Sequence, residues 1–80
     1  MTTSIRIQAD EAKRLRNDTA FKQFVQSVRE LQISIFMNSA AEDIDSREEA
    51  HAVLRALDQI EIQLNAAIAA ETMLDRKQRN

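Results

Sequence analysis

The residues that could do chemistry gather around the single histidine. Glu48 lies one helical turn before His51, so a metal-binding or proton-transferring pair could share one helical face. A zinc site needs three or four ligands, and the chain has no cysteine and no second histidine to complete one. Asp45, Ser46 and His51 supply the residue types of a hydrolytic triad, but no nucleophile-elbow motif accompanies them. We therefore predict a non-enzymatic protein with no catalytic residue, metal, cofactor or small-molecule substrate.

Basic residues cluster near the two ends of the chain and could contact phosphates. The candidates are Lys13, Arg14, Arg16, Arg76, Lys77 and Arg79. The chain has neither Trp nor Tyr to stack on bases, its formal net charge is −2, and it shows no helix-turn-helix spacing. We favour the interpretation that these side chains are solvated and complement helix dipoles, with nucleic-acid contact as an open alternative.

The composition predicts that only helices position these residues. The 80 residues include no Gly, no Pro and no Cys. Tight hairpin turns and phosphate-binding loops need glycine, so β-meanders and nucleotide-binding loops are disfavoured. A single domain of this size has a small core and, without disulfides, is typically stabilised by oligomerisation.

Apolar spacing predicts one all-α domain over residues 1–80, built as an antiparallel hairpin of two unequal long helices with a short helix before it. We expect a short helix at about 8–16, a long helix at about 18–40, a loop at 41–45 and a long helix at about 46–77. Asn17 or Asp18 should cap the first long helix, and Ser46 with Glu49 should form a capping box for the second. The short helix could fold back onto the C-terminal excess of the second.

One apolar stripe on the first long helix is expected to face the second long helix. Its members are Phe21, Phe24, Val25, Val28, Leu31 and Ile35. In the hairpin, Phe21 should lie opposite Leu64 and Val28 opposite Leu57. Both basic ends should then meet at one end of the molecule, while the acidic segment 38–50, with a net charge of −4, lies at the other.

Further apolar residues lie away from that seam and predict a second buried face. The interface candidates are Ile33, Phe36, Met37, Ile62, Ala66, Ala69 and Met73. We expect them to bind further copies of the chain, another protein, or both, so that the hairpins assemble into an oligomeric helical bundle with partial coiled-coil character.

No apolar run is long enough to span a membrane, and the N-terminus lacks the apolar segment of a secretory signal. The chain is therefore expected in the cytoplasm, away from membranes.

Two segments carry a family resemblance. Residues 10–24 place an Asn-Asp pair before a Phe-containing helix, and residues 45–64 place an Arg-Glu-rich helix start before Ala56-Leu57-Asp58. Over about residues 9–68 the chain resembles small helical proteins encoded in the structural and packaging regions of tailed bacteriophages and prophages. The resemblance implies an assembly or adaptor protein in the host cytoplasm or the virion.

Two alternatives stay open. One is a DNA-packaging accessory that resembles a small terminase subunit, with the basic ends collected around DNA. The other is a small inhibitor of a host defence or regulatory enzyme, in which the acidic loop 42–49 mimics nucleic-acid charge.

Overall fold

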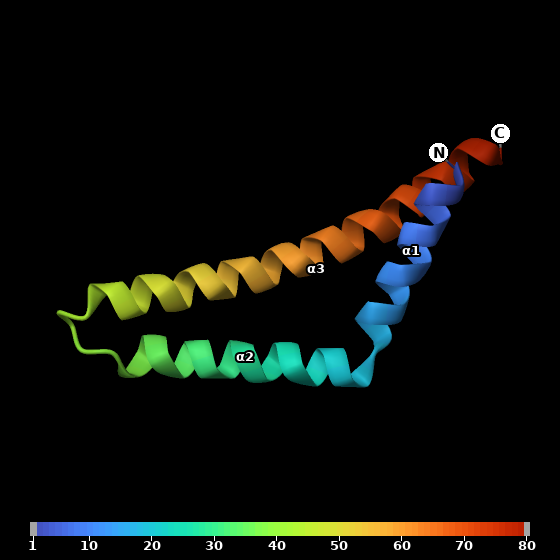
Figure 1. Ribbon diagram of the computed structural model, residues 1–80. Coiled ribbons are helices and arrows are strands. Elements are labelled where there is room, and N and C mark those ends of the chain that lie inside the picture. Colours follow the sequence, from blue (N-terminus) through green and yellow to red (C-terminus); the bar gives the residue numbers. More distant parts are fainter. Residues whose placement is uncertain (1, 80) are drawn as a thin grey trace.

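Three helices make up the fold in the computed structural model, which describes residues 2–79. They are α1 (Thr2–Asn17), α2 (Thr19–Asn38) and α3 (Ile44–Gln78). α2 and α3 form an antiparallel hairpin, and α1 runs back from the C-terminal end of α3 to the start of α2, so the start of α1 lies beside the end of α3 (Figure 1). The prediction of an all-α fold whose long helices pack on each other is confirmed for this part of the chain.

Two aspartates begin the long helices. The Asp18 carboxylate accepts a hydrogen bond from the Phe21 amide at 2.8 Å, and this one extended residue separates α1 from α2. Asp43 accepts from the Ser46 amide at 3.4 Å, so α3 begins at Ile44. The predicted capping box at Ser46 is therefore wrong, because Ser46 lies inside the first turn and its amide already has a partner.

α1 is longer than the predicted helix at 8–16 because it continues back to Thr2. Ala9 and Ala12 are buried, and such small side chains let the two helix backbones approach closely. Arg6, before the predicted start, reaches Asp75 and Gln78 of α3. These tertiary contacts explain why the N-terminal turns are helical.

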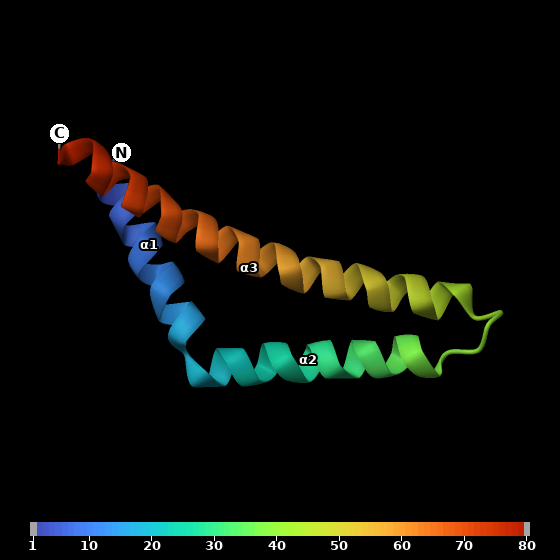
Figure 2. The same ribbon diagram turned by 180° about the vertical axis from the view of Figure 1, so that it is seen from behind.

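The molecule is elongated and has little interior. Its extents are 58 × 23 × 16 Å and its radius of gyration is 17.3 Å, against about 12 Å for a compact chain of this length. Among the described residues, the buried hydrophobic side chains are Ala9, Ala12, Ala50 and Leu57. The helices diverge from one another toward the α1–α2 corner, as Figure 2 also shows from behind, and among the described residues Leu57 is the one large apolar side chain that they bury.

The apolar stripe of α2 does not all face α3, which corrects the sequence-based expectation. Phe21 and Leu64 line one groove, as the predicted register requires. Phe24 and Leu31, however, are 72% and 58% exposed. The stripe spans too wide an arc for one neighbouring helix to cover, so α3 contacts one edge and leaves the other open.

Candidate interaction surfaces

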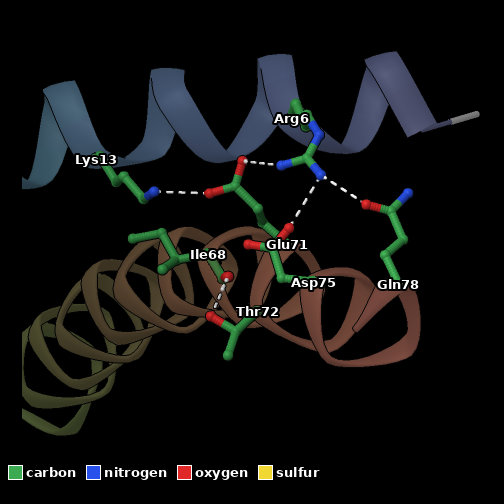
Figure 3. A network of polar contacts seen from close by, with 7 residues as sticks. All are labelled: Arg6, Lys13, Ile68, Glu71, Thr72, Asp75 and Gln78. Carbon is green, nitrogen blue, oxygen red and sulfur yellow. Dashed lines mark hydrogen bonds and ion pairs between the residues drawn. The ribbon is translucent and has the colours of Figure 1, made fainter. Parts of the chain in front are cut away.

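A polar cluster fixes α1 on α3 (Figure 3). The Glu71 carboxylate, whose side chain is only 12% exposed, accepts a hydrogen bond from Lys13 Nζ at 2.7 Å and pairs with Arg6 at 3.6 Å. Arg6 also donates to Asp75 at 2.9 Å and to Gln78 at 3.1 Å. The hydrogen bond to Glu71, followed by its negative charge, raises the pKa of Lys13 above 10.5. These side chains are engaged in holding two helices together.

The six basic candidates for nucleic-acid contact do not form one patch. Lys13 is engaged with Glu71. Arg16 lies at the α1–α2 corner, where it lines a groove beside Asn65 of α3. Arg76 lies eleven residues after Asn65 on α3, which is about 16 Å along the helix axis. Because α1 runs antiparallel to α3, its basic C-terminal end points away from the basic end of α3.

His51 lies beside a shallow hollow at the loop end of the hairpin. The hollow has a volume of about 620 Å³, and it is also lined by Phe36, Met37, Ile44 and Glu48. Across residues 2–79, no group of three or more His, Cys, Asp or Glu side chains is placed to hold a metal ion. The hollow offers mainly apolar contact area at the end of α2.

A second groove, also of about 620 Å³, lies where α2 and α3 diverge near the α1–α2 corner. Phe21, Val25, Leu57, Ile60 and Leu64 provide its apolar lining. On one side of the hairpin, Arg29 bridges the two helices. It donates to Asp58 at 3.1 Å and to Glu61 at 3.3 Å.

An exposed apolar surface runs along α2, although the sequence pattern predicts that these residues face α3. It consists of Phe24, Val28, Leu31 and Ile35, which are 72%, 39%, 58% and 37% exposed, and we call it the α2 stripe. At 100° per residue these four side chains lie within about 60° of one another. Their steps of four, three and four residues are those of a coiled-coil seam.

The α2 stripe and the Arg29 ion pairs lie on different sides of the hairpin. At 100° per residue, Arg29 is about 130° around α2 from the centre of the stripe. On α3, Ile60 is 43% exposed and lies about 160° around the helix from Asp58. The α2 stripe is therefore directed away from the Arg29 ion pairs, whereas Ile60 lines the same groove as Arg29 and Glu61.

All seven interface candidates predicted from the sequence are exposed, but they belong to separate surfaces. Ile33 lies on the face of α2 opposite the α2 stripe, and Phe36 and Met37 both line the hollow beside His51. The members on α3 lie about half a turn around that helix from Glu71, which faces α1. These members are Ile62, Ala66, Ala69 and Met73.

Comparison with known proteins adds no assignment, since no protein-family model, curated protein or solved structure matches the chain. Along residues 2–79, no helix carries a stretch that is both apolar and long enough to cross a bilayer.

Proposed function

We propose that this protein is a non-enzymatic assembly or adaptor subunit that works through protein–protein contacts, including contacts with further copies of itself. The observation that supports this most is the amount of surface left uncovered. The accessible surface is 6269 Å², whereas a monomeric protein of 9.1 kDa exposes about 4,900 Å². The difference, about 1,400 Å², exceeds the roughly 800 Å² that each partner buries in a standard interface.

The chemical character of that surface supports the same function. Thirteen large hydrophobic side chains of the described chain are exposed, against one that is buried. Single exposed apolar residues are normal on a monomer, but contiguous stripes of them mark interaction sites. The hollow beside His51 and the groove between α2 and α3 are shallow and bring together no set of catalytic groups. They therefore suit a helix or a side chain of a partner protein better than a substrate.

We place this function in a tailed bacteriophage or prophage, on the sequence resemblance over residues 9–68. The proposed role is in particle assembly, where small helical subunits act by repeated contact. DNA packaging is the weaker alternative, because Lys13 is engaged with Glu71 and the two basic ends are separated.

Light scattering during size-exclusion chromatography tests the self-association. We expect a mass above that of the monomer at tens of micromolar, with dissociation on dilution. A monomer throughout this range would remove self-association from the proposal. The phage setting is tested by the genes beside the coding sequence, which should encode virion or packaging proteins; neighbours of unrelated function would contradict it.

A further inference from the structure

We propose that the α2 stripe binds the same stripe of a second copy in an antiparallel, two-fold arrangement, which rests on the self-association proposed above. The spacing is the first reason. Steps of four, three and four residues read the same in both directions along the helix. An antiparallel pair therefore sets Phe24 opposite Ile35 of the second copy and Val28 opposite Leu31, and every apolar position finds an apolar partner.

The residues beside the stripe allow the same arrangement. Ser27, Ser34 and Gln32 flank it and carry no charge, and residues 31–41 contain no charged side chain at all. Two copies of α2 therefore meet without like charges at the seam, and the serines are small enough for close approach. The charged residue Arg29 faces α3 instead, where Asp58 and Glu61 occupy its guanidinium group.

Charge at the ends of α2 selects the antiparallel direction over the parallel one. A parallel pair would place the two acidic segments 38–50 side by side, each with a net charge of −4. In the antiparallel pair, Glu42 of one copy lies level with the α1–α2 corner of the other. Arg14 and Arg16 are exposed at that corner, and no ion pair engages either of them within residues 2–79. The opposite charges then meet twice in each dimer.

The other side of the hairpin is a poorer surface for a second copy. Arg29, Asp58 and Glu61 occupy it, and covering them would bury three charges. The α2 stripe, about 130° around the helix from Arg29, carries none of these charges. Two hairpins joined on this side form a four-helix arrangement, with the two acidic loops at opposite ends.

Cysteine cross-linking tests the direction directly, since the natural chain contains no cysteine. Two single variants, Phe24→Cys and Ile35→Cys, are oxidised separately and as a mixture. In the antiparallel pair, like positions are about 16 Å apart along the helix, too far for a disulfide. We expect little disulfide dimer from either variant alone and efficient formation of the mixed dimer. Disulfide formation by Phe24→Cys alone, without the mixed product, would indicate a parallel pair and overturn the proposal.

Charge reversal provides an independent test that leaves the stripe intact. Arg16→Glu and Glu42→Lys should each weaken dimerisation by about tenfold at low salt, because exposed ion pairs are individually weak and each dimer has two of them. A mixture of the two variants should restore binding, since each charge contact in the heterodimer again joins opposite signs. Circular dichroism of each variant checks that the helices are retained. Lack of complementation would overturn the antiparallel pairing.

The outcomes separate this inference from the function on which it rests. If the natural chain is monomeric at every concentration, the stripe pairing and the self-association both fail, and only the adaptor role toward a different protein is left. If it is oligomeric but gives no mixed disulfide, the function stands and the α2 stripe pairing is wrong. Oligomers that persist when Leu31 is changed to Asp, with helicity retained, would likewise place the contact elsewhere or assign the stripe to a different protein.

Discussion

Replacement of Leu31 by alanine should weaken self-association strongly while leaving the fold in place. The substitution removes three carbon groups, each worth about 0.8 kcal/mol when buried. Because 58% of Leu31 is exposed in the single chain, dimerisation would bury that fraction of the side chain. The part of these three groups that becomes buried is worth about 1.4 kcal/mol in each copy. Both copies of a dimer lose it, so the dissociation constant should rise about 100-fold.

Ile33→Ala is the matched control for this prediction. Ile33 belongs to the same helix, is 46% exposed, and lies about 200° around α2 from Leu31. Sedimentation velocity over a dilution series from micromolar to hundreds of micromolar should show a large shift for Leu31→Ala and a shift of less than about threefold for Ile33→Ala. Equal effects of the two variants would refute the assignment of the interface, and a larger effect at Ile33 would place it on the opposite face of α2.

Four further predictions follow from individual contacts. Leu57→Ala should lower the free energy of unfolding by about 2–5 kcal/mol and abolish cooperative thermal melting by circular dichroism, because Leu57 is the one large buried side chain of the described residues; a loss below about 1 kcal/mol would contradict this. Glu71→Gln should lower the free energy of unfolding by about 1–2 kcal/mol, a value kept low because the partner side chains Arg6 and Lys13 are half-exposed. Hydrogen exchange should accelerate more in α1 than in α2, and equal acceleration in both helices would contradict the local role. Asp18→Ala should cost about 0.5–2 kcal/mol in chemical denaturation by removing a helix cap, and no measurable loss would show that the cap is dispensable. The contact with Glu71 that raises the pKa of Lys13 should stabilise the fold fully below pH 10.5 and progressively less as the pH rises above it. Lys13→Met should therefore flatten the alkaline limb of a plot of unfolding free energy against pH, and an unchanged limb would refute the coupling.

The secondary structure was predictable because local signals decide it. The absence of Gly and Pro, the aspartate at 18 and the apolar periodicity together define two long helices in antiparallel order. The first helix was predicted too short because residues 2–7 carry no helical apolar pattern of their own. Their helicity depends on Arg6 and on contacts with residues almost seventy positions away, which no local pattern reports.

The interaction surfaces were harder to predict because an apolar stripe in the sequence indicates a buried helix face but does not indicate which element or molecule covers it. Phe24 and Leu31 have the same spacing whether they face α3 or a second copy, and we assigned them to the intramolecular seam. Arg29 could have distinguished a face toward α3 from a face toward a second copy. Its guanidinium group needs acidic partners, and it pairs with Asp58 and Glu61 of α3. Glu71 offered a similar signal, since an acid inside the apolar face of α3 calls for cations.

The need for a second layer follows from the geometry of the helices. α1 and α2 both pack along α3 and make little contact with each other, so the described helices form two pairs rather than a closed bundle. Stable domains bury their apolar faces between at least two layers, and a single layer can hide only the narrow seams along which its helices touch. The absence of helix breakers lets α3 run for 35 residues, which spreads α1 and α2 end to end along it instead of stacking them. The described helices therefore leave apolar residues on their outer faces, and these are the residues that the proposed self-association would cover.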